Sequence, residues 1–424
     1  MSSRYRRVDR TLIFGLLVGL LGVSQLAVPI AGGFATAEPA APAAALAAKG
    51  FPGMSTFAAW GTRTTFHVPA SIDATGVTDV TQPLNAYLSG IHKDSTVVFP
   101  ANGRYRIEGT LSVYGKTDFV IDGNNSTFFA TTNGLAGPPP PNCQGNGPCH
   151  PNRGRMQWDF QSDTNLYVHD TNVIGASTAS GLGGTYIVAY EGQHAYNIGS
   201  GHNIVLDHVT AKNTWGDLVY IGGGNANKPA TNVVVADSTF DGASRQCFTV
   251  VDASHVLISN NSIGLQRGCT RSLFDFEANV SSSVISYVAI KGNRLGHSRM
   301  STFNDAGAAA TEHDITVDGN TMDRAVFGVN VQGFRNSHRA NYRFTNNVGT
   351  NAYNQGSMHI EYVDGLVVSG NTQPYRPDAW PQRGYLGSQA PVWVNCSSNV
   401  HVGGNHFRPR PVGMGEFVSH QSHC

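Results

Sequence analysis

Two short segments of the chain combine residue types that could carry acid-base chemistry. They are Arg245-Gln246 and Asp275-Phe276-Glu277-Ala278-Asn279. If the second segment is a strand, Asp275 and Glu277 point to the same side with Cα atoms about 6.6 Å apart. Carboxyl pairs separated by about 5 to 9.5 Å hydrolyse glycosidic bonds, one as the acid and the other as base or nucleophile. The spacing therefore predicts a catalytic group of Arg245, Asp275 and Glu277.

The same residues allow other interpretations. Arg245 could neutralise a uronate or stabilise an enolate in a lyase. Asp275 and Glu277 could bind Ca²⁺ in such a lyase, whereas a hydrolase would require no cofactor. Arg245 and Asp275 could also form a purely structural ion pair. The residue types alone leave these readings open.

A repeated unit must position these residues. It reads apolar, any, apolar, any, any, polar (usually Asn), any, apolar, as in the copies that begin at Val233, Val256, Val288, Ile315 and Val400. Apolar residues at every second position predict a strand, and the Gly-Asn or Asn-Asn pair supplies a residue able to adopt positive φ at a corner. Repeats of about 20 to 50 residues indicate a solenoid. We expect one stacked ladder of amides from Asn261, Asn293, Asn320, Asn371 and Asn405.

A second series of strands lies between the repeat units, starting at Thr185, Leu218, Cys247, Leu273, Val326, Ser357 and Val392. Alternation places Phe274, Phe276 and their equivalents inward and polar residues outward. An outer face of amides, carboxylates and aromatic rings suits a sugar-binding groove, although polar side chains also simply face water. The residues expected to bind substrate are Asp217, Tyr220, Gln246, Thr249, Asn279, Asn330, His359, Glu361 and Trp393.

The N-terminal part of the repeat region resembles a known family. Asp73-Ala-Thr-Gly-Val-Thr-Asp79, a helix with Leu84, Tyr87, Leu88 and Ile91 on one face, Val97-Val-Phe-Pro-Ala101 and Tyr105-Arg-Ile107 occur in this order. The order is similar to the entry of the pectin lyase-like superfamily. The resemblance implies an all-β, single-stranded right-handed parallel β-helix, closed at its start by a capping helix that we expect to begin at an N-cap Thr81.

The catalytic motifs of the best-known members are not matched. Asn213-Thr-Trp-Gly-Asp217 has Trp215 where polygalacturonase-like hydrolases have the first Asp, and Gly201-His-Asn203 lacks their second Gly. The Asp-Asp pair of those hydrolases and the Arg-x-Pro-x-x-Arg signature of pectate lyases are missing from the sequence. The family's catalytic residues therefore cannot be carried over, and fold alone does not establish an activity.

The charge composition limits the classes of partner that the protein could bind. Charged residues make up 13% of the 424-residue chain, and its 28 basic and 28 acidic side chains cancel. A net charge of zero argues against binding to nucleic acid. We expect a polysaccharide or cell-surface glycan as partner, and a monomeric protein.

The chain begins like an exported protein. Arg4, Arg6, Arg7 and Arg10 precede the apolar run 12–30, and Ala35-Thr36-Ala37 fits a signal peptidase site. We expect a signal peptide over residues 1–37 and a secreted mature protein without a membrane span; an uncleaved anchor is the alternative. Residues 38–70 form an Ala/Pro-rich linker and entry segment, 71–408 the β-helix domain, and 409–424 a C-terminal tail.

Six cysteines in an exported chain favour disulfides. The spacing suggests Cys143 with Cys149, Cys247 with Cys269, and Cys396 with Cys424, the last holding the tail. Six cysteines allow 15 connectivities, so these pairings are expectations. A metal site is the alternative, but neither a Cys-x-x-Cys nor a His-x-x-x-His spacing occurs in the sequence.

Overall fold

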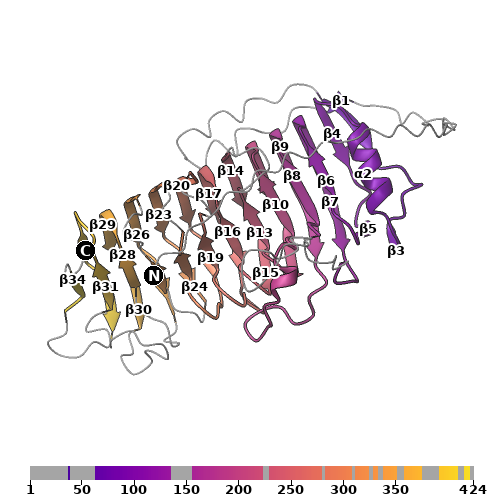
Figure 1. Ribbon diagram of the computed structural model, residues 1–424. Coiled ribbons are helices and arrows are strands. Elements are labelled where there is room, and N and C mark those ends of the chain that lie inside the picture. The colour runs from indigo at the N-terminus through magenta and orange to yellow at the C-terminus, as the bar shows by residue number, and fades with distance from the viewer. Residues whose placement is uncertain are drawn as a thin grey trace, which may run out of the picture. The chain divides into compact units, whose positions relative to one another are not determined.

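The computed structural model describes residues 37–38, 63–134, 155–222, 229–278, 282–307, 311–323, 328–332, 338–350, 358–374, 391–408 and 415–420. Nearly all elements in these ranges are strands paired in parallel, and they form successive coils (Figure 1). From residue 202 onward each complete coil contributes three strands, one to each of three runs. Two runs belong to a 23-stranded sheet, and the third forms an 11-stranded sheet.

The first run carries the repeat units found in the sequence. Its strands are β2 (Arg63–His67), β4 (Ser95–Val98), β7 (Thr117–Phe129), β9 (Thr164–Ile174), β11 (His202–Asp207), β14 (Ala230–Ala236), β17 (Ala253–Ser259), β20 (Val284–Lys291), β23 (Thr311–Asp318), β26 (His338–Thr345), β29 (Val363–Ser369) and β32 (His401–Gly403). A short strand β1 (Ala37–Glu38) pairs antiparallel with β2. Val256, Val288 and Ile315 align in register and are buried, which confirms the predicted repeat frame.

The second run follows the Asn corner. Its strands are β3 (Thr75–Asp79), β5 (Arg104–Arg106), β12 (Thr210–Thr214), β15 (Thr239–Ala243), β18 (Ser262–Ile263), β21 (Arg294–Leu295), β24 (Thr321–Met322), β27 (Val348–Gly349), β30 (Thr372–Pro374) and β33 (His406–Arg408), and the long strands β7 and β9 also extend into it.

The 11-stranded sheet closes each coil. Its strands are β6 (Ser112–Tyr114), β8 (Trp158–Gln161), β10 (Tyr196–Gly199), β13 (Val219–Ile221), β16 (Phe248–Val250), β19 (Phe274–Phe276), β22 (Phe303–Asp305), β25 (Val329–Val331), β28 (Met358–Glu361), β31 (Val392–Asn395) and β34 (Phe417–His420). The inward side chains of all three runs make one hydrophobic core, which includes Phe240, Phe248, Phe274 and Phe276.

The predicted Asn ladder is present and has one further rung, Asn347. At each rung the Oδ1 of one Asn accepts bonds from the backbone N–H and the Nδ2 of the preceding rung, as Asn320 does from Asn293 at 2.9 Å each. The corner residues before the rungs have positive φ, including Asn260 at 58° and Gly292 at 61°. The last rung is capped by Glu416, whose Oε1 accepts from the N–H (2.9 Å) and Nδ2 (2.5 Å) of Asn405.

A helix lies at the N-terminal end of the stack (Figure 1). Helix α2 (Thr81–Gly90) buries Leu84 and Leu88, and Ile91 follows it into the core, as the sequence predicts. The predicted N-cap is wrong by one residue, because Val80 holds that position. Asp79 instead accepts bonds from the N–H and hydroxyl of Thr81, at 3.0 and 2.6 Å.

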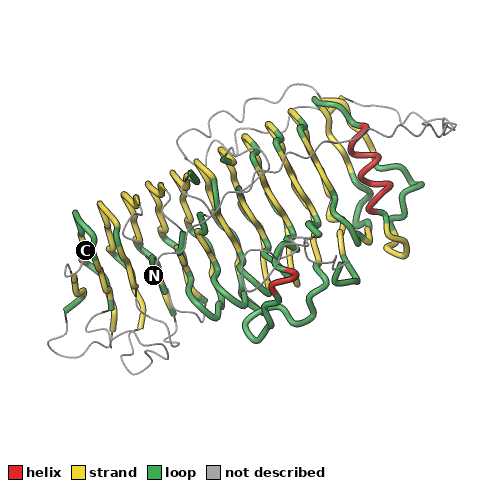
Figure 2. The backbone as a smooth tube through the Cα atoms, in the orientation of Figure 1, coloured by secondary structure: helices red, strands yellow, loops and turns green. Residues whose placement is uncertain are grey.

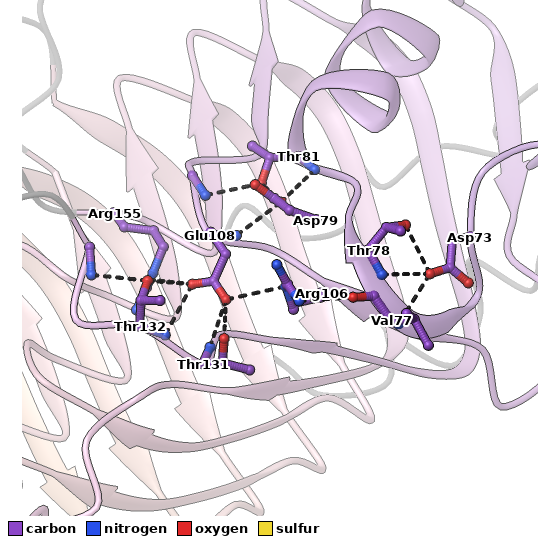
Figure 3. Close-up of polar contacts among 12 residues, drawn as sticks. Asp73, Val77, Thr78, Asp79, Thr81, Arg106, Glu108, Thr131, Thr132 and Arg155 are labelled. Carbon is purple, nitrogen blue, oxygen red and sulfur yellow. Dashed lines mark hydrogen bonds and ion pairs between the residues drawn. The ribbon is translucent and has the colours of Figure 1, made fainter.

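The residues that carry the family resemblance have structural roles (Figure 3). Asp73 accepts bonds from the backbone and side chains of Thr75 and Thr78 and so closes its own loop. These hydrogen bonds, led by the Thr75 hydroxyl, lower the pKa of the Asp73 carboxyl. Glu108 accepts hydrogen bonds from Thr131 and Thr132 and forms an ion pair with Arg155.

The disulfide prediction is confirmed for Cys247 and Cys269, which are bonded to each other in the core. Cys396 is also disulfide-bonded. Cys143, Cys149 and Cys424 lie outside the described residues, so the other two pairings stay predictions. No helix in the described part of the chain is long and apolar enough to cross a membrane.

Candidate functional site

The candidate residues lie on the outer face of the 11-stranded sheet. One column of side chains crosses its strands in register: Asn197, Tyr220, Thr249, Asp275, Asn304, Asn330, His359 and Trp393. The inward neighbours Phe274, Phe276, Val329 and Val331 are buried in the core. Alternation in the sequence therefore assigned the two faces correctly.

Two elements of this sheet differ from the sequence interpretation. The segment at Thr185 is not a strand: Val188–Tyr190 form a 3₁₀ helix, η2, and the strand of this coil is β10. The ring of Tyr190, in η2, packs against that of Trp215 with centroids 5.3 Å apart. Strand β22 went unrecognised because Asp305 occupies an inward position and breaks the apolar alternation.

Arg245 is the centre of the predicted catalytic group. It lies just before β16 and bridges two coils, donating from Nη1 to Asp217 Oδ2 at 2.6 Å and from Nη2 to Glu277 Oε2. Glu191 Oε2 lies 3.9 Å from its Nε. Arg245 thus pairs with Glu277 and Asp217, and no ion pair to Asp275 is found among the described residues.

Asp275 is held by amides. Gln246 Nε2 donates to its Oδ2 at 2.8 Å, and Asn304 Nδ2 donates to its Oδ1 at 2.5 Å. Asp275 is 3% exposed. Burial, reinforced by the charge of Glu277, raises the pKa of Asp275 to about 7. Glu277 is the accessible member of the pair, since its side chain is 37% exposed.

The fully buried Asp217 completes the base of the site. It accepts bonds from the Gln246 N–H at 2.9 Å and the Thr249 hydroxyl at 2.9 Å, besides the bond from Arg245. Burial raises its pKa, and the Arg245 charge opposes that shift. Asp217 and Thr249, predicted to bind substrate, therefore hold Arg245 in place.

The remaining predicted residues fall into two groups. Asn330 Nδ2 donates to Asn304 Oδ1 at 2.7 Å, which extends the amide chain from Asp275 along the sheet. Farther along, the His359 ring nitrogen lies 3.0 Å from Glu361 Oε1, and the His359 and Trp393 rings are 4.2 Å apart. His359 is three strands from Asp275, about 14 Å by strand spacing. Asn279 lies outside the described residues.

The sequence did not predict that residues 175–194 lie beside Arg245. Residues 175–194 leave the coil between β9 and β10 and contact later coils, through Leu182 N–H to Arg267 O at 2.7 Å and Thr270 Oγ1 to Gly181 O at 2.7 Å. The excursion brings Glu191 to Arg245 and places Tyr186 so that its hydroxyl donates to Glu191 (Figure 2, loop around the short helix). The long stretch of sequence between β9 and β10 was the feature that could have revealed this segment.

His194 is the last residue of this segment and contacts Tyr220 and Asp217. Its ring stacks on Tyr220 with centroids 4.6 Å apart, and its Nδ1 accepts a bond from the Asp217 N–H at 3.1 Å. Burial, with the nearby charge of Arg245, lowers the pKa of His194 to about 3. His194 is therefore neutral and acts as an acceptor.

The same excursion lines an open cavity of about 340 Å³, bordered by Ala179, Ser180, Leu182, Gly183, Gly184 and Arg267. Arg267 is held there by Asn213 Oδ1 at 2.8 Å and Thr178 O at 2.7 Å. This cavity does not include Asp275 or Glu277 in its lining.

Comparison with known proteins identifies the fold. No protein-family model matches the chain, and no curated protein is a significant match to its sequence. The structure is similar to that of endo-xylogalacturonan hydrolase from Aspergillus tubingensis, with a TM-score of 0.51 and 15% identity over 84% of this chain and 99% of that one.

Two further solved structures align with lower scores. PfbA, a surface adhesin of Streptococcus pneumoniae, has a TM-score of 0.48 and 14% identity over 79% of this chain and 89% of that one. Polygalacturonase from Erwinia carotovora has a TM-score of 0.43 and 13% identity over 84% of this chain and 96% of that one. The chain therefore has a right-handed parallel β-helix fold, as the sequence predicts.

Proposed function

We propose that this protein binds polysaccharide along the outer face of the 11-stranded sheet and hydrolyses it at Asp275 and Glu277. The main support for this proposal is that two nearby carboxylates, Asp275 on β19 and Glu277 directly after it, have opposite surroundings. Asp275 is buried among amides, whereas Glu277 is accessible and paired with Arg245. Such a difference separates the proton donor from the base.

The chemistry follows from these surroundings. Asp275, with its pKa raised to about 7 by burial, is the group that gives a proton to the glycosidic oxygen. Glu277, ion-paired with Arg245, activates water or attacks the sugar. Asn304 and Gln246 orient Asp275.

The charges favour a neutral glycan. Arg245 is already shared by Asp217 and Glu277, with Glu191 nearby, so it has little positive charge left for a uronate. The oxygens of Asp275 accept amide donors and Glu277 accepts Arg245, which leaves a poor donor set for Ca²⁺. These contacts support hydrolysis over elimination.

A non-catalytic glycan-binding protein is the second candidate. Two observations favour it: Arg245 holds Glu277 in an ion pair, and Asp275 has little solvent exposure. In either case the polar column from Asn197 to Trp393 is the contact surface. We propose that the protein works outside the cell, as its N-terminal sequence predicts.

A polysaccharide panel tests both candidates. The purified protein, its Asp275→Asn and Glu277→Gln variants, and a Thr321→Ala control would be incubated with neutral and uronate-containing polysaccharides. We expect new reducing ends from a neutral polysaccharide with wild type and control, and at least a hundredfold loss in both carboxylate variants.

The other outcomes are informative as well. Ultraviolet-absorbing unsaturated products from a uronate polymer would contradict hydrolysis and show a lyase. Binding on affinity electrophoresis, without any product, would leave the binding protein as the function. Full activity in Glu277→Gln would refute the assignment of that residue.

A further inference from the structure

A second cluster of ligand-type side chains lies on the 23-stranded sheet, away from the proposed glycan surface. Asp122 on β7, His169 and Asp170 on β9 bring their ligand atoms within 4.8 Å of one another. His169 Nδ1 is 2.8 Å from Asp170 Oδ2 and 3.8 Å from Asp122 Oδ1. All three side chains remain partly accessible to solvent, at 21% for His169 and 29% for Asp122.

A third carboxylate borders this cluster. Asp122, His169 and Asp207 align in register on three successive coils. Tyr167 stacks on His169 with ring centroids 4.8 Å apart, and its hydroxyl donates to Asp207 Oδ2 at 3.0 Å. Burial, with the charges of Asp207, Asp170 and Asp122, raises the pKa of Tyr167.

The negative charge here is poorly compensated. None of the three carboxylates has a Lys or Arg ion-pair partner among the described residues. Asp207 is 9% exposed, and its Oδ1 is buried without a hydrogen bond. The neighbour of that oxygen is the ring Nδ1 of exposed His208 at 3.1 Å, an ion pair when His208 is protonated.

The chain contains an internal comparison. His313 and Asp314 on β23 form the same His-Asp contact, with His313 Nδ1 2.7 Å from Asp314 Oδ2. The register neighbours of His313 are Ser286 and Ala340, so no carboxylate flanks it there. The two flanking carboxylates at His169 are thus not needed to hold a His-Asp pair.

We propose that Asp122, His169 and Asp170 bind one divalent transition metal ion, with Asp207 as an outer carboxylate. One imidazole and two carboxylates are ligands that Zn²⁺ accepts. Bond lengths of about 2.0 to 2.2 Å around tetrahedral Zn²⁺ separate neighbouring donors by roughly 3.4 Å. The observed 2.8 and 3.8 Å lie on either side of that value. The ion would join the coils of β7 and β9.

Calorimetric titration of the untagged full chain with ZnCl₂ tests the proposal, with CaCl₂ as a second probe. We expect one Zn²⁺ per chain, weak or no Ca²⁺ binding because of the imidazole ligand, and a Zn²⁺-dependent rise in the melting temperature. Asp122→Asn and His169→Gln should each weaken Zn²⁺ binding by at least about tenfold. His313→Gln should bind Zn²⁺ like the wild type.

Melting curves without metal would show whether each variant folds, and Asp122→Asn, which changes few atoms, guards against a misfolded His169→Gln. Equal Zn²⁺ affinity in wild type and both site variants would overturn the proposal, because the ion would then sit on other histidines. Loss of binding in His313→Gln, or no binding by the wild type at micromolar Zn²⁺, would overturn it too.

Discussion

At the scale of single residues, the protonation state of Asp275 decides the proposed chemistry. Its carboxyl has to carry a proton when the glycosidic bond breaks, and burial raises its pKa to about 7. The neighbouring Glu277, the proposed base or nucleophile, forms an ion pair with Arg245.

We expect hydrolysis by the wild type to decline as pH rises through about 7, because Asp275 then loses its proton. Initial rates of reducing-end release on the most active substrate, measured from pH 4 to 9, would show the decline. Asn304→Ala removes an amide that bonds to the ionised Asp275 and should move the fall of the profile to higher pH. A rate that stays constant to pH 9 would argue against Asp275 as the acid.

A second buried charged group lies inside the core. Arg339 donates to Asp305 at 2.9 and 2.7 Å and to Glu312 at 3.1 Å, and the Tyr342 hydroxyl lies 2.8 Å from Asp305 and 3.0 Å from Glu312. One arginine cannot neutralise two carboxylates. Burial, followed by the charge of Asp305, accordingly raises the pKa of Glu312 to about 9.

This shift predicts a pH dependence of stability. Between the ordinary value of 4.5 and about 9, folded Glu312 keeps a proton that the unfolded chain has released. The free energy of unfolding therefore falls as pH rises across this window. Urea unfolding of wild type and Glu312→Gln at pH 5, 7 and 9 should show a smaller decline in the variant; parallel declines would contradict the assignment.

At the scale of elements, the Asn ladder fixes how coils stack. Each rung accepts bonds from the backbone N–H and the side-chain amide of the preceding Asn. Asn320 accepts both donors of Asn293 and donates its own to Asn347 and to the Ile290 carbonyl. It thus ties together three coils.

Asn320→Ala would leave the Asn293 N–H without its acceptor and would remove the bond from Asn293 Nδ2 and the bonds that Asn320 Nδ2 donates to Asn347 and the Ile290 carbonyl. With about 1 to 3 kcal/mol for the unsatisfied buried N–H and about 0.5 to 1.5 kcal/mol for each other lost bond, we expect the free energy of unfolding to fall by about 3 kcal/mol or more. Thr321→Ala, at an exposed position next to it, should change it by less than about 0.5 kcal/mol. Similar urea midpoints for the two variants would show that the ladder contributes little.

At the scale of the whole molecule, the disulfide links the coil that carries Arg245 to the following one. Cys247 and Cys269 are 22 residues apart and fully buried. Chain-entropy reasoning gives about 3 kcal/mol for a loop of this length. Its position directly before β16 also holds the backbone next to Gln246, which binds Asp275.

The double variant Cys247→Ala, Cys269→Ala should lose about 3 kcal/mol of stability in guanidinium unfolding. It should also lose activity or glycan affinity below the wild-type melting temperature, since Gln246 would be less firmly placed. Unchanged stability, with the disulfide shown by mass spectrometry in the wild type, would contradict this expectation.

The sequence by itself determined the scaffold. Apolar alternation, the Gly-Asn and Asn-Asn corners and the recurring unit specify strands, turns and stacking, because these depend on residues close together in the chain. It also assigned Asp275 and Glu277 to one face, since residues two positions apart in an extended segment point to the same side. Strand β22 was not predicted, because Asp305 occupies an inward position where the alternation has an apolar residue.

Only the tertiary structure decided which groups meet. Arg245 pairs with Asp217 and Glu277, while Gln246 and Asn304 hold Asp275, because side-chain length and coil register select partners from different coils. The same holds for Glu191, carried to Arg245 by the excursion of residues 175–194, and for the ligands around His169. Such contacts join positions far apart in the chain, and no local pattern encodes their distances.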